Sequence, residues 1–428
     1  MKNCAFTIVA KNYIGLAQIL ESSIRKYYND LSFLIIVADE VPEELKKELP
    51  QNVLIAKECL GILDEVWDDM SFKYDLTEFC TSLKPASFLY LFNEYGFEKV
   101  VYLDPDIYFY NSIGLVFEML EKCSILLTPH ITQISERGLS DSSENTWFSC
   151  GMYNLGFCGL HRSFSVDRML NWWHERLLDN CYIDNYNFLF TDQKWIDFLP
   201  SFFSSKDLNI SLHLGMNVAP WNFYERKVFE ENGGLYVAAR YNSGEKFPLL
   251  FVHYSGYDYR QLKKGCISQK NISGIRNYAD VKILMSLYAQ AIQSKSDIFD
   301  RFISLQYSYN TYHNGQTITS VHRRLYRALV AKGHFYYHPF DVSQKSFYEL
   351  LKKRGILVTS VINIDKMNKQ NVPNVKNKLR RINLFFKMVY RILGYDRYFM
   401  MMRLLRPFSR YESQIYLLDD KYLTNNIY

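Results

Sequence analysis

The stretch CAFTIVAKNYIGLAQILESSIRKYYNDLSFLIIVAD, residues 4–39, predicts a strand, a helix and a second strand. The apolar runs over 4–10 and 33–39 are of strand length, and apolar residues recur at helical spacing between 15 and 28. Two strands joined by a helix pair in parallel, because the helix returns the chain to the end at which the first strand began. This unit therefore predicts a parallel sheet.

The same alternation continues to residue 104. Four further elements are predicted: a helix over 41–49, a strand over 52–56, a helix over 76–95 and a strand over 99–104. We therefore expect an α/β fold with a Rossmann-like, mixed and mainly parallel sheet that carries helices on both faces. Ligands of such sheets bind beyond the carboxyl ends of the strands. We expect the chemistry just after residues 10, 39 and 104.

The composition is that of a globular protein of two or three domains. The chain has 428 residues, 48% of them hydrophobic and 22% charged, and its 19 glycines and 11 prolines are too few for a fibrous or low-complexity protein. It contains no apolar run of about 20 residues, the length that a membrane span needs. The eight cysteines form no CxxC pair, which favours a reducing, cytoplasmic location.

The pattern changes near residue 262, where mainly helical signals replace the alternation of strands and helices. We predict an N-terminal domain over 1–262 and a mainly helical C-terminal region over 263–428, with the segment KNISGIRN, 270–277, as the linker.

The segment 376–410 is strongly basic. It holds ten Lys and Arg against one acid, Asp396, while the rest of the chain is slightly acidic. Apolar residues recur within it at helical spacing: Ile382, Phe385, Phe386, Val389, Ile392 and Leu393. A basic amphipathic helix of this kind is typical of peripheral contact with an anionic membrane surface. An ordinary packed helix with a solvated basic face is the alternative; nucleic acid is not favoured, since no recognised motif accompanies the charge.

The sharpest local motif is VVYLDPDIYFY, residues 100–110, in which an apolar strand leads directly into Asp104 and Asp106. Two carboxylates one residue apart at a strand end can both face a hard divalent cation, Mg²⁺ or Mn²⁺, that also takes diphosphate oxygens. Two other interpretations stay open. The motif can be a polar strand end, or Asp104 can be the nucleophile of an aspartyl phosphotransferase, although Tyr108 stands where that class usually has Thr or Val.

Three further segments carry candidate side chains. GMYNLGFCGL, 151–160, offers the Asn154 amide and, at Gly156, a close backbone approach to a ligand, or is a strand with a bulge. FTDQKWIDFLP, 190–200, offers Asp192 and Gln193, with a helix N-cap as the alternative role of Asp192. LLFVHYSGYDYR, 249–260, ends a strand at His253. With Asp104 and Asp106, His253 would complete a mixed oxygen and nitrogen set that suits Mn²⁺ better than Mg²⁺.

Taken together and in this order, these segments resemble the retaining sugar-nucleotide glycosyltransferases of the A-type fold, a group that includes glycogenin and bacterial lipopolysaccharide galactosyl- and glucosyltransferases. The resemblance covers residues 4–260 and rests on TIVAKNYIGLAQILESSI, YLDPD, NLGFCGL, TDQ and HYSG. It implies a nucleotide-sugar-binding catalytic domain over 1–262, a UDP-sugar donor, and Mn²⁺ that bridges the donor diphosphate.

The resemblance also assigns roles to residues. The metal ligands would be Asp104, Asp106 and His253. The nucleotide would lie against Ala10, Asn12 and Asp39, with Lys84 near the diphosphate or ribose; Asn154, Gly156, Asp192 and Gln193 would meet the donor sugar or the acceptor. The late motif departs from the HFxGxxKPW of the family: it reads HYSGYDYRQLKKG, so Gly256 is kept and Arg260, Lys263 or Lys264 would replace the missing lysine.

The function expected from the resemblance is a metal-dependent glycosyltransferase of the hexosyltransferase class. It would build a cell-surface polysaccharide or lipopolysaccharide, with retention, on a glycan or lipid-linked acceptor. The enzyme would be cytoplasmic and peripheral on the inner face of the membrane. The alternatives are the aspartyl phosphotransferase that uses Asp104 and a non-catalytic nucleotide-sugar-binding protein.

Overall fold

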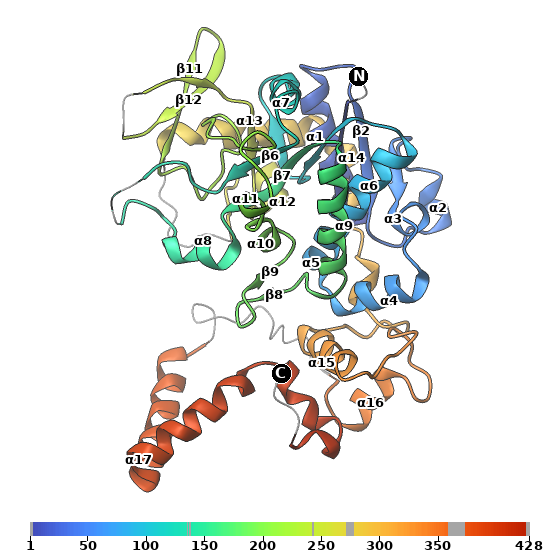
Figure 1. Ribbon diagram of the computed structural model, residues 1–428, viewed down its shortest axis with the longest axis vertical. Helices are drawn as coiled ribbons and strands as arrows, with labels where there is room; N and C mark the ends of the chain where they lie inside the picture. The colour runs from blue at the N-terminus through green and yellow to red at the C-terminus, as the bar shows by residue number, and fades with distance from the viewer. Residues whose placement is uncertain are drawn as a thin grey trace. The chain divides into compact units, whose positions relative to one another are not determined.

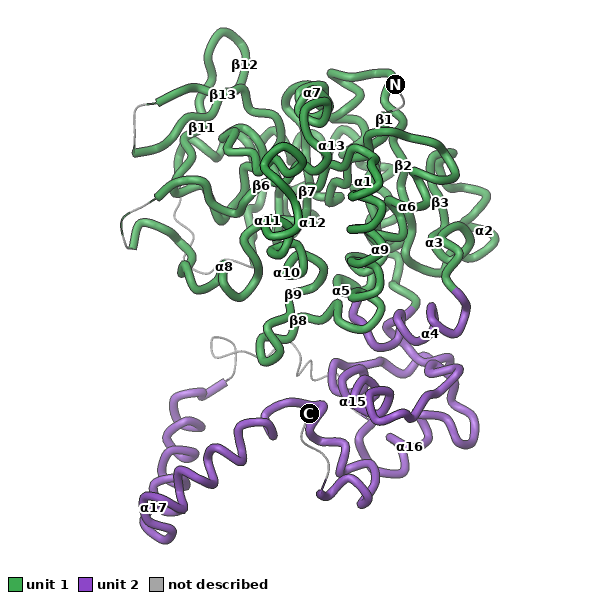
Figure 2. The backbone as a smooth tube through the Cα atoms, viewed as in Figure 1, with its two compact units in different colours: residues 1–62, 76–308 green, residues 63–75, 309–428 purple. Residues whose placement is uncertain are grey.

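The computed structural model describes residues 3–134, 136, 138–241, 244–270, 278–357 and 373–424. The chain divides into two compact units (Figure 2): unit 1 comprises residues 1–62 and 76–308, and unit 2 comprises residues 63–75 and 309–428.

Unit 1 is built on a seven-stranded sheet of order β10-β6-β7-β4-β1-β2-β3. Its strands are β1 (Asn3–Val9), β2 (Ser32–Val37), β3 (Val53–Ile55), β4 (Lys99–Leu103), β6 (Ile125–Pro129), β7 (Tyr153–His161) and β10 (Leu208–Ile210). β1 is parallel to both β2 and β4, and only β7 runs antiparallel to its neighbours. The mixed, mainly parallel sheet expected from the sequence is confirmed.

Helices cover both faces of the sheet. Alternate residues of β1 point to opposite faces, and apolar side chains on each face pack against a helix. Ala5 and Val9 pack in one apolar cluster with α1 (Ile14–Arg25), whereas the ring of Phe6 meets that of Phe88 on α6 (Lys84–Glu94) at a centroid distance of 4.9 Å. The helix expected over 76–95 is two helices, α5 (Leu76–Ser82) and α6, since Pro85 has no backbone N–H to continue the first one. The helix expected over 41–49 is the single turn α2 (Glu43–Lys46).

Two smaller sheets and a short hairpin complete the strands of unit 1. β5 (Ile107–Phe109) pairs antiparallel with β14 (Phe251–His253), which sets His253 opposite Ile107. β11 (Arg226–Glu231), β12 (Gly234–Ala239) and β13 (Phe247–Pro248) form the other, and β8 (Ile183–Asp184) with β9 (Leu189–Phe190) makes a short hairpin. Unit 1 also contains the helices α3 (Ala56–Cys59), α7 (Gly114–Leu120), α8 (Glu144–Cys150), α9 (Phe164–Asp179), α10 (Gln193–Ile196), α11 (Leu199–Phe202) and α12 (Tyr259–Lys263).

The compact units divide at residue 308, whereas the sequence places the boundary at 262. α13 (Lys282–Ser294) and α14 (Ser296–Ile303) belong to unit 1, because Leu284, Tyr288 and Phe299 pack with apolar side chains of α1 in one core cluster. Gly15 on α1 sits so close to α14 that an added Cβ would lie 2.8 Å from the carbonyl oxygen of Ile298. Most of the proposed linker, 271–277, lies outside the described residues.

Unit 2 is helical and takes in a segment from the N-terminal half of the chain. Its helices are α4 (Asp64–Lys73), α15 (Ser320–Ala331), α16 (Phe347–Lys353) and α17 (Val375–Leu405). Arg323 on α15 donates hydrogen bonds to the carbonyls of Phe72 and Tyr74, at 2.5 and 2.7 Å, and so caps the end of α4. Over the residues described, no helix has an apolar stretch long enough to cross a membrane.

Candidate active site

Asp104 and Asp106 lie directly after β4, at the carboxyl end of the strand. A tyrosine holds one oxygen of each carboxylate: Tyr102 donates to Asp104 Oδ1 at 2.6 Å and Tyr259 donates to Asp106 Oδ2 at 2.8 Å. The second oxygens, Asp104 Oδ2 and Asp106 Oδ1, lie 3.6 and 3.1 Å from Nε2 of His253. The three residues singled out as metal ligands are therefore brought together.

The cluster fits a divalent cation. One ligand atom from each of Asp104, Asp106 and His253 lies within 4.8 Å of the others, so two carboxylate oxygens and an imidazole nitrogen converge. Gly156 on β7 leaves the room that this needs, because an added Cβ would overlap His253 Cε1 and lie 2.8 Å from Asp104 Oδ2. Two hard oxygens and one imidazole are a donor set that Mn²⁺ accepts, and Mg²⁺ accepts its oxygen part.

The charges of the cluster are mutually dependent. Burial raises the pKa of Asp104, and the nearby Lys84 and His253 do not fully offset it. Burial would also raise the pKa of Asp106, but the attraction and hydrogen bond of His253 outweigh it and lower that pKa. Burial would lower the pKa of His253, but Asp106 and then Asp104 raise it overall. The cluster therefore favours a positive charge between the two carboxylates.

Asn154 fixes the orientation of the His253 ring. Its Oδ1 lies 3.1 Å from His253 Nδ1, and the same oxygen accepts a hydrogen bond from Asn217 Nδ2 at 3.1 Å. An amide oxygen is only an acceptor, so His253 Nδ1 carries the proton and donates it. This arrangement turns Nε2 toward the two carboxylates.

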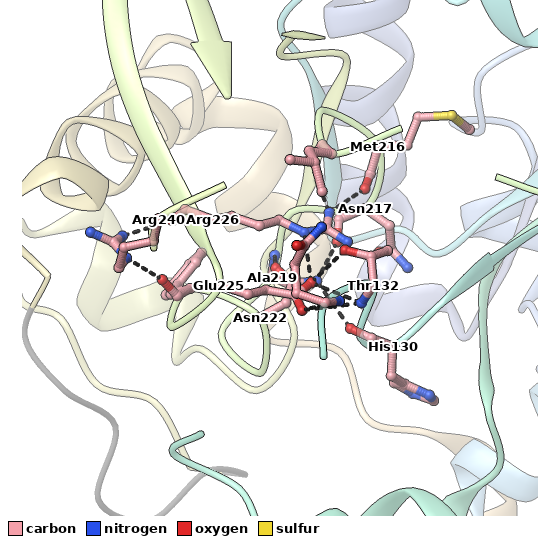
Figure 3. A network of polar contacts seen from close by, with 12 residues as sticks. His130, Thr132, Met216, Asn217, Ala219, Asn222, Glu225, Arg226 and Arg240 are labelled. Carbon is pink, nitrogen blue, oxygen red and sulfur yellow. Dashed lines mark hydrogen bonds and ion pairs between the residues drawn. The ribbon is translucent and has the colours of Figure 1, made fainter. Parts of the chain in front are cut away.

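Asn217 was not singled out from the sequence, although it holds Asn154 in place. It is fully buried, its φ of +54° is in the left-handed region, and its Nδ2 also donates to Thr128 Oγ1 at 3.0 Å. Asn222 donates in turn to the carbonyl oxygens of Asn217 and His130, at 2.9 and 3.3 Å (Figure 3). The signal in the sequence is weak: two asparagines within the apolar run LGMNVAPWN, 214–222.

Lys84 and Asp192 form a buried ion pair, which the sequence did not predict. Lys84 Nζ lies 2.8 Å from Asp192 Oδ2, donates to the Leu155 carbonyl at 2.7 Å, and both side chains are about 2% exposed. Burial would lower the pKa of Lys84, but Asp192 and Asp104 raise it overall. Although Asp192 precedes α10, its side chain makes no capping hydrogen bond, so the N-cap interpretation is wrong.

Gln193 and Thr191 flank this ion pair. Gln193 Nε2 donates to the Cys150 carbonyl at 2.8 Å, which joins α10 to the end of α8. Thr191 has a φ of +47°, an unfavourable conformation for a β-branched residue, and its hydroxyl donates to Asp192 Oδ1 at 3.1 Å. The chain around Asp192 is thus held in a strained conformation.

The residues after β1 and β2 form a second polar group. Lys11 Nζ lies 3.0 Å from Asp39 Oδ2, and Ser308 N donates to Asp39 Oδ1 at 3.0 Å. Asp39 is fully buried, and burial raises its pKa in spite of Lys11. Asn12 Oδ1, by contrast, is a buried acceptor with no hydrogen-bond partner in the described part of the chain. A buried acceptor of this kind needs a donor, and a bound ligand can supply one.

The segment after β14 holds the remaining predicted residues. Gly256 lies in the turn that follows His253, and its carbonyl accepts from Lys270 N at 2.9 Å. Lys263 is paired with Asp300 of α14 at 2.5 Å, and Arg260 donates to the Ile303 carbonyl at 2.7 Å. Both side chains are engaged with the α14 segment, so a role on a diphosphate would require them to change partners.

Comparisons with known proteins give relatives and structural neighbours. No family model matches the chain. The uncharacterized proteins YfnF and YfnD of Bacillus subtilis (strain 168) are 25% and 22% identical to it over 261 and 254 residues, which are 60% and 59% of this chain and 82% and 76% of the relatives.

Solved structures similar to the chain include the galactosyltransferase LgtC in complex with donor and acceptor sugar analogs, with 14% identity, a TM-score of 0.40, and coverage of 68% of this chain and 99% of that one. Mouse xyloside xylosyltransferase 1 is 13% identical, with a TM-score of 0.37 and coverage of 60% and 98%. Both of these solved structures are of glycosyltransferases.

Proposed function

We propose that the chain is a metal-dependent glycosyltransferase that moves a sugar from a nucleotide-sugar, a UDP-sugar in our proposal, to a glycan or lipid-linked acceptor. The observation that carries the proposal is the convergence of Asp104, Asp106 and His253 at the carboxyl end of β4. In a mainly parallel sheet this is the end at which ligands bind. The orphaned Asn12 Oδ1, after the neighbouring strand β1, supports a nucleotide on the same edge.

Each residue of the candidate site has its own role in this proposal. Asp104, Asp106 and His253 would hold Mn²⁺, which would neutralise the charge that develops on the diphosphate leaving group. Asn154, held by Asn217, keeps the His253 ring turned toward that position. Asp192 is paired with Lys84 and is poised to meet the hydroxyls or the developing positive charge of the donor sugar, as a carboxylate does in glycoside hydrolysis. Gln193 ties this segment to α8.

We place the reaction in the retaining class and the acceptor in cell-surface polysaccharide or lipopolysaccharide synthesis, in keeping with the family that the sequence resembles. An anionic membrane surface is the partner that we propose for the basic segment 376–410. The aspartyl phosphotransferase is not favoured, because Tyr108 stands where that class usually has Thr or Val, and because His253 converges with both carboxylates of the pair.

Calorimetric titration with a panel of nucleotide-sugars, with and without Mn²⁺, tests the proposal. We expect one donor to bind only with Mn²⁺, and Asp106→Ala to abolish that binding. The matched control is Asp30→Ala, which removes an exposed aspartate outside the cluster and should leave binding unchanged. Turnover of the same donor with an acceptor separates an enzyme from a binding protein. Indifference of the wild type to every nucleotide-sugar would overturn the proposal.

A further inference from the structure

Helix α17 has no buried residue along its whole length, Val375–Leu405. Twelve of its large apolar or aromatic side chains are more than a third exposed, among them Ile382 at 48%, Phe385 at 55% and Ile392 at 74%. So many exposed apolar side chains on one helix are unusual for a protein surface, and such a surface marks a place where a partner binds.

The first arm of α17, residues 375–393, is amphipathic. Val375, Leu379, Ile382, Phe386, Val389 and Leu393 recur every three or four residues and therefore share one face. Leu379 and Ile382 are more than a third exposed, and the other four are half-buried. Lys376, Arg380, Lys387 and Arg391 lie together on another face. Lys378 and Arg381 lie between these two faces, so bases also border the apolar face.

The charge of α17 selects the chemistry of the partner. Its 31 residues include eight Lys and Arg and a single acid, Asp396. None of these eight bases forms an ion pair within the described part of the chain. The three-and-four spacing of the apolar face would also suit a coiled coil with a second copy, but that pairing sets two strongly basic helices side by side with no acid in 375–393 to pair the charges. An anionic lipid surface complements both faces at once, because its acyl chains can take up the apolar face and its headgroups can pair with the bases.

A bend at Gly394 divides the helix into two arms, as Figure 1 shows. Gly394 has φ +74° and ψ 179°, a conformation outside the helical region that glycine tolerates, and the rings of Tyr390 and Tyr398 meet across the bend at 5.4 Å. A hollow of about 910 Å³ lies along the second arm and is lined mainly by apolar side chains, including Phe399 and Met402 and, from the first arm, Phe386, with Arg403 beside them. Lipid chains would fill such a hollow without new polar partners.

We infer that α17 lies in the plane of the interface of an anionic lipid bilayer, with the apolar face of 375–393 among the acyl chains and its bases at the lipid headgroups. Neither arm is long and apolar enough to span a bilayer, so the helix lies on the membrane and does not cross it. The inference extends the proposed function, on which it rests for the membrane-bound acceptor, and gives the basic segment a defined geometry: insertion by one face, with no dependence on a particular headgroup beyond its charge.

The experiment is flotation of the full-length protein with vesicles of phosphatidylcholine, with and without 30% phosphatidylglycerol. We expect binding to the anionic vesicles alone, weakened when salt is raised from 0.1 to 0.5 M. Ile382→Ser combined with Val389→Ser should reduce the partition coefficient by about tenfold or more, since apolar insertion is lost. Leu384→Ser, a more exposed apolar side chain that lies beside the bases, is the control and should change the coefficient by less than about threefold.

Three outcomes would overturn the inference. The first is an equal loss of vesicle binding in Leu384→Ser, and the second is equal binding to neutral vesicles. The third is a dimer in light scattering that Ile382→Ser with Val389→Ser dissociates, in a protein that binds no vesicles; this outcome would assign the face to a second copy. Mn²⁺-dependent nucleotide-sugar binding, measured on the same variants, should be unchanged. A wild type that binds vesicles but no nucleotide-sugar would overturn the proposed function and leave the membrane inference intact.

Discussion

His253 and Asn154 are joined through Nδ1 of the imidazole and Oδ1 of the amide, 3.1 Å apart. Because the amide oxygen also accepts from Asn217 Nδ2, it cannot rotate away without leaving a buried donor unpaired. The imidazole ring is therefore held with Nε2 toward Asp104 and Asp106. The second layer of the site is thus an asparagine pair from β7 and from the segment after β10.

Loss of this support should weaken metal binding. Asn154→Ala removes the acceptor that orients His253, and we expect the affinity for Mn²⁺ to fall by about 10- to 100-fold. Titration of free Mn²⁺ by electron paramagnetic resonance measures the affinity without a substrate. Asn209→Ala, on the edge strand β10, is the control with an equal change of side chain. Unchanged affinity in Asn154→Ala would show that His253 is oriented by its other neighbours.

Gly156 should tolerate no side chain. Gly156→Ala places a Cβ against His253 Cε1 and 2.8 Å from Asp104 Oδ2, so we expect loss of Mn²⁺ binding and a fall of about 1–3 kcal/mol in the free energy of unfolding. Gly159→Ala is the matched control on the same strand, where the Cβ meets the tip of Leu120 at 3.2 Å and the Cβ of Leu126 at 3.5 Å. Chemical denaturation of both variants gives the comparison; equal effects would contradict the crowding at Gly156.

The buried ion pair of Lys84 and Asp192 should show strong coupling. Lys84→Met keeps the length of the side chain but leaves Asp192 as an uncompensated buried charge, which costs about 3–5 kcal/mol of stability. Lys84→Met with Asp192→Asn removes both charges and should recover a large part of that loss. A double-mutant cycle by urea denaturation measures the coupling. Additive effects of the two substitutions would mean that the pair does not interact in solution.

The protonation of His253 should make stability depend on pH in the metal-free protein. Its pKa in the folded state is raised above its ordinary 6.5, because Asp106 and Asp104 outweigh the effect of burial. A raised pKa contributes stability that is complete below pH 6.5 and is lost as the pH rises through the folded-state value.

His253→Gln tests this dependence. The difference in unfolding free energy between the wild type and the variant should therefore shrink between pH 6 and pH 9, measured with a chelator present. Asp106 acts at the other extreme: its lowered pKa contributes stability that is lost only as the pH falls below its ordinary 3.8. A difference that grows with pH above 6.5 would contradict the raised pKa of His253.

The alternation of strands and helices was predictable because its signals are local. The runs 4–10, 33–39 and 99–104 coincide with β1, β2 and β4, and Asp104 follows β4 as a strand-end residue should. The helix over 76–95 was predicted as one element, since its apolar spacing continues through Pro85. Local periodicity does not indicate which core a helix packs on, as α13 and α14 pack on α1. For this reason the boundary expected from the sequence lies at 262, whereas the compact units divide at 308.

The candidate metal ligands and the basic amphipathic helix could be named from residue types and spacing, because a carboxylate pair at a strand end and a run of bases between apolar residues are properties of the chain itself. The pairing of Lys84 with Asp192, the support of His253 by Asn154 and Asn217, and the inclusion of 63–75 in unit 2 could not. These contacts join residues far apart in sequence, and they form only once the order of the strands and the packing of the helices bring them within hydrogen-bond distance.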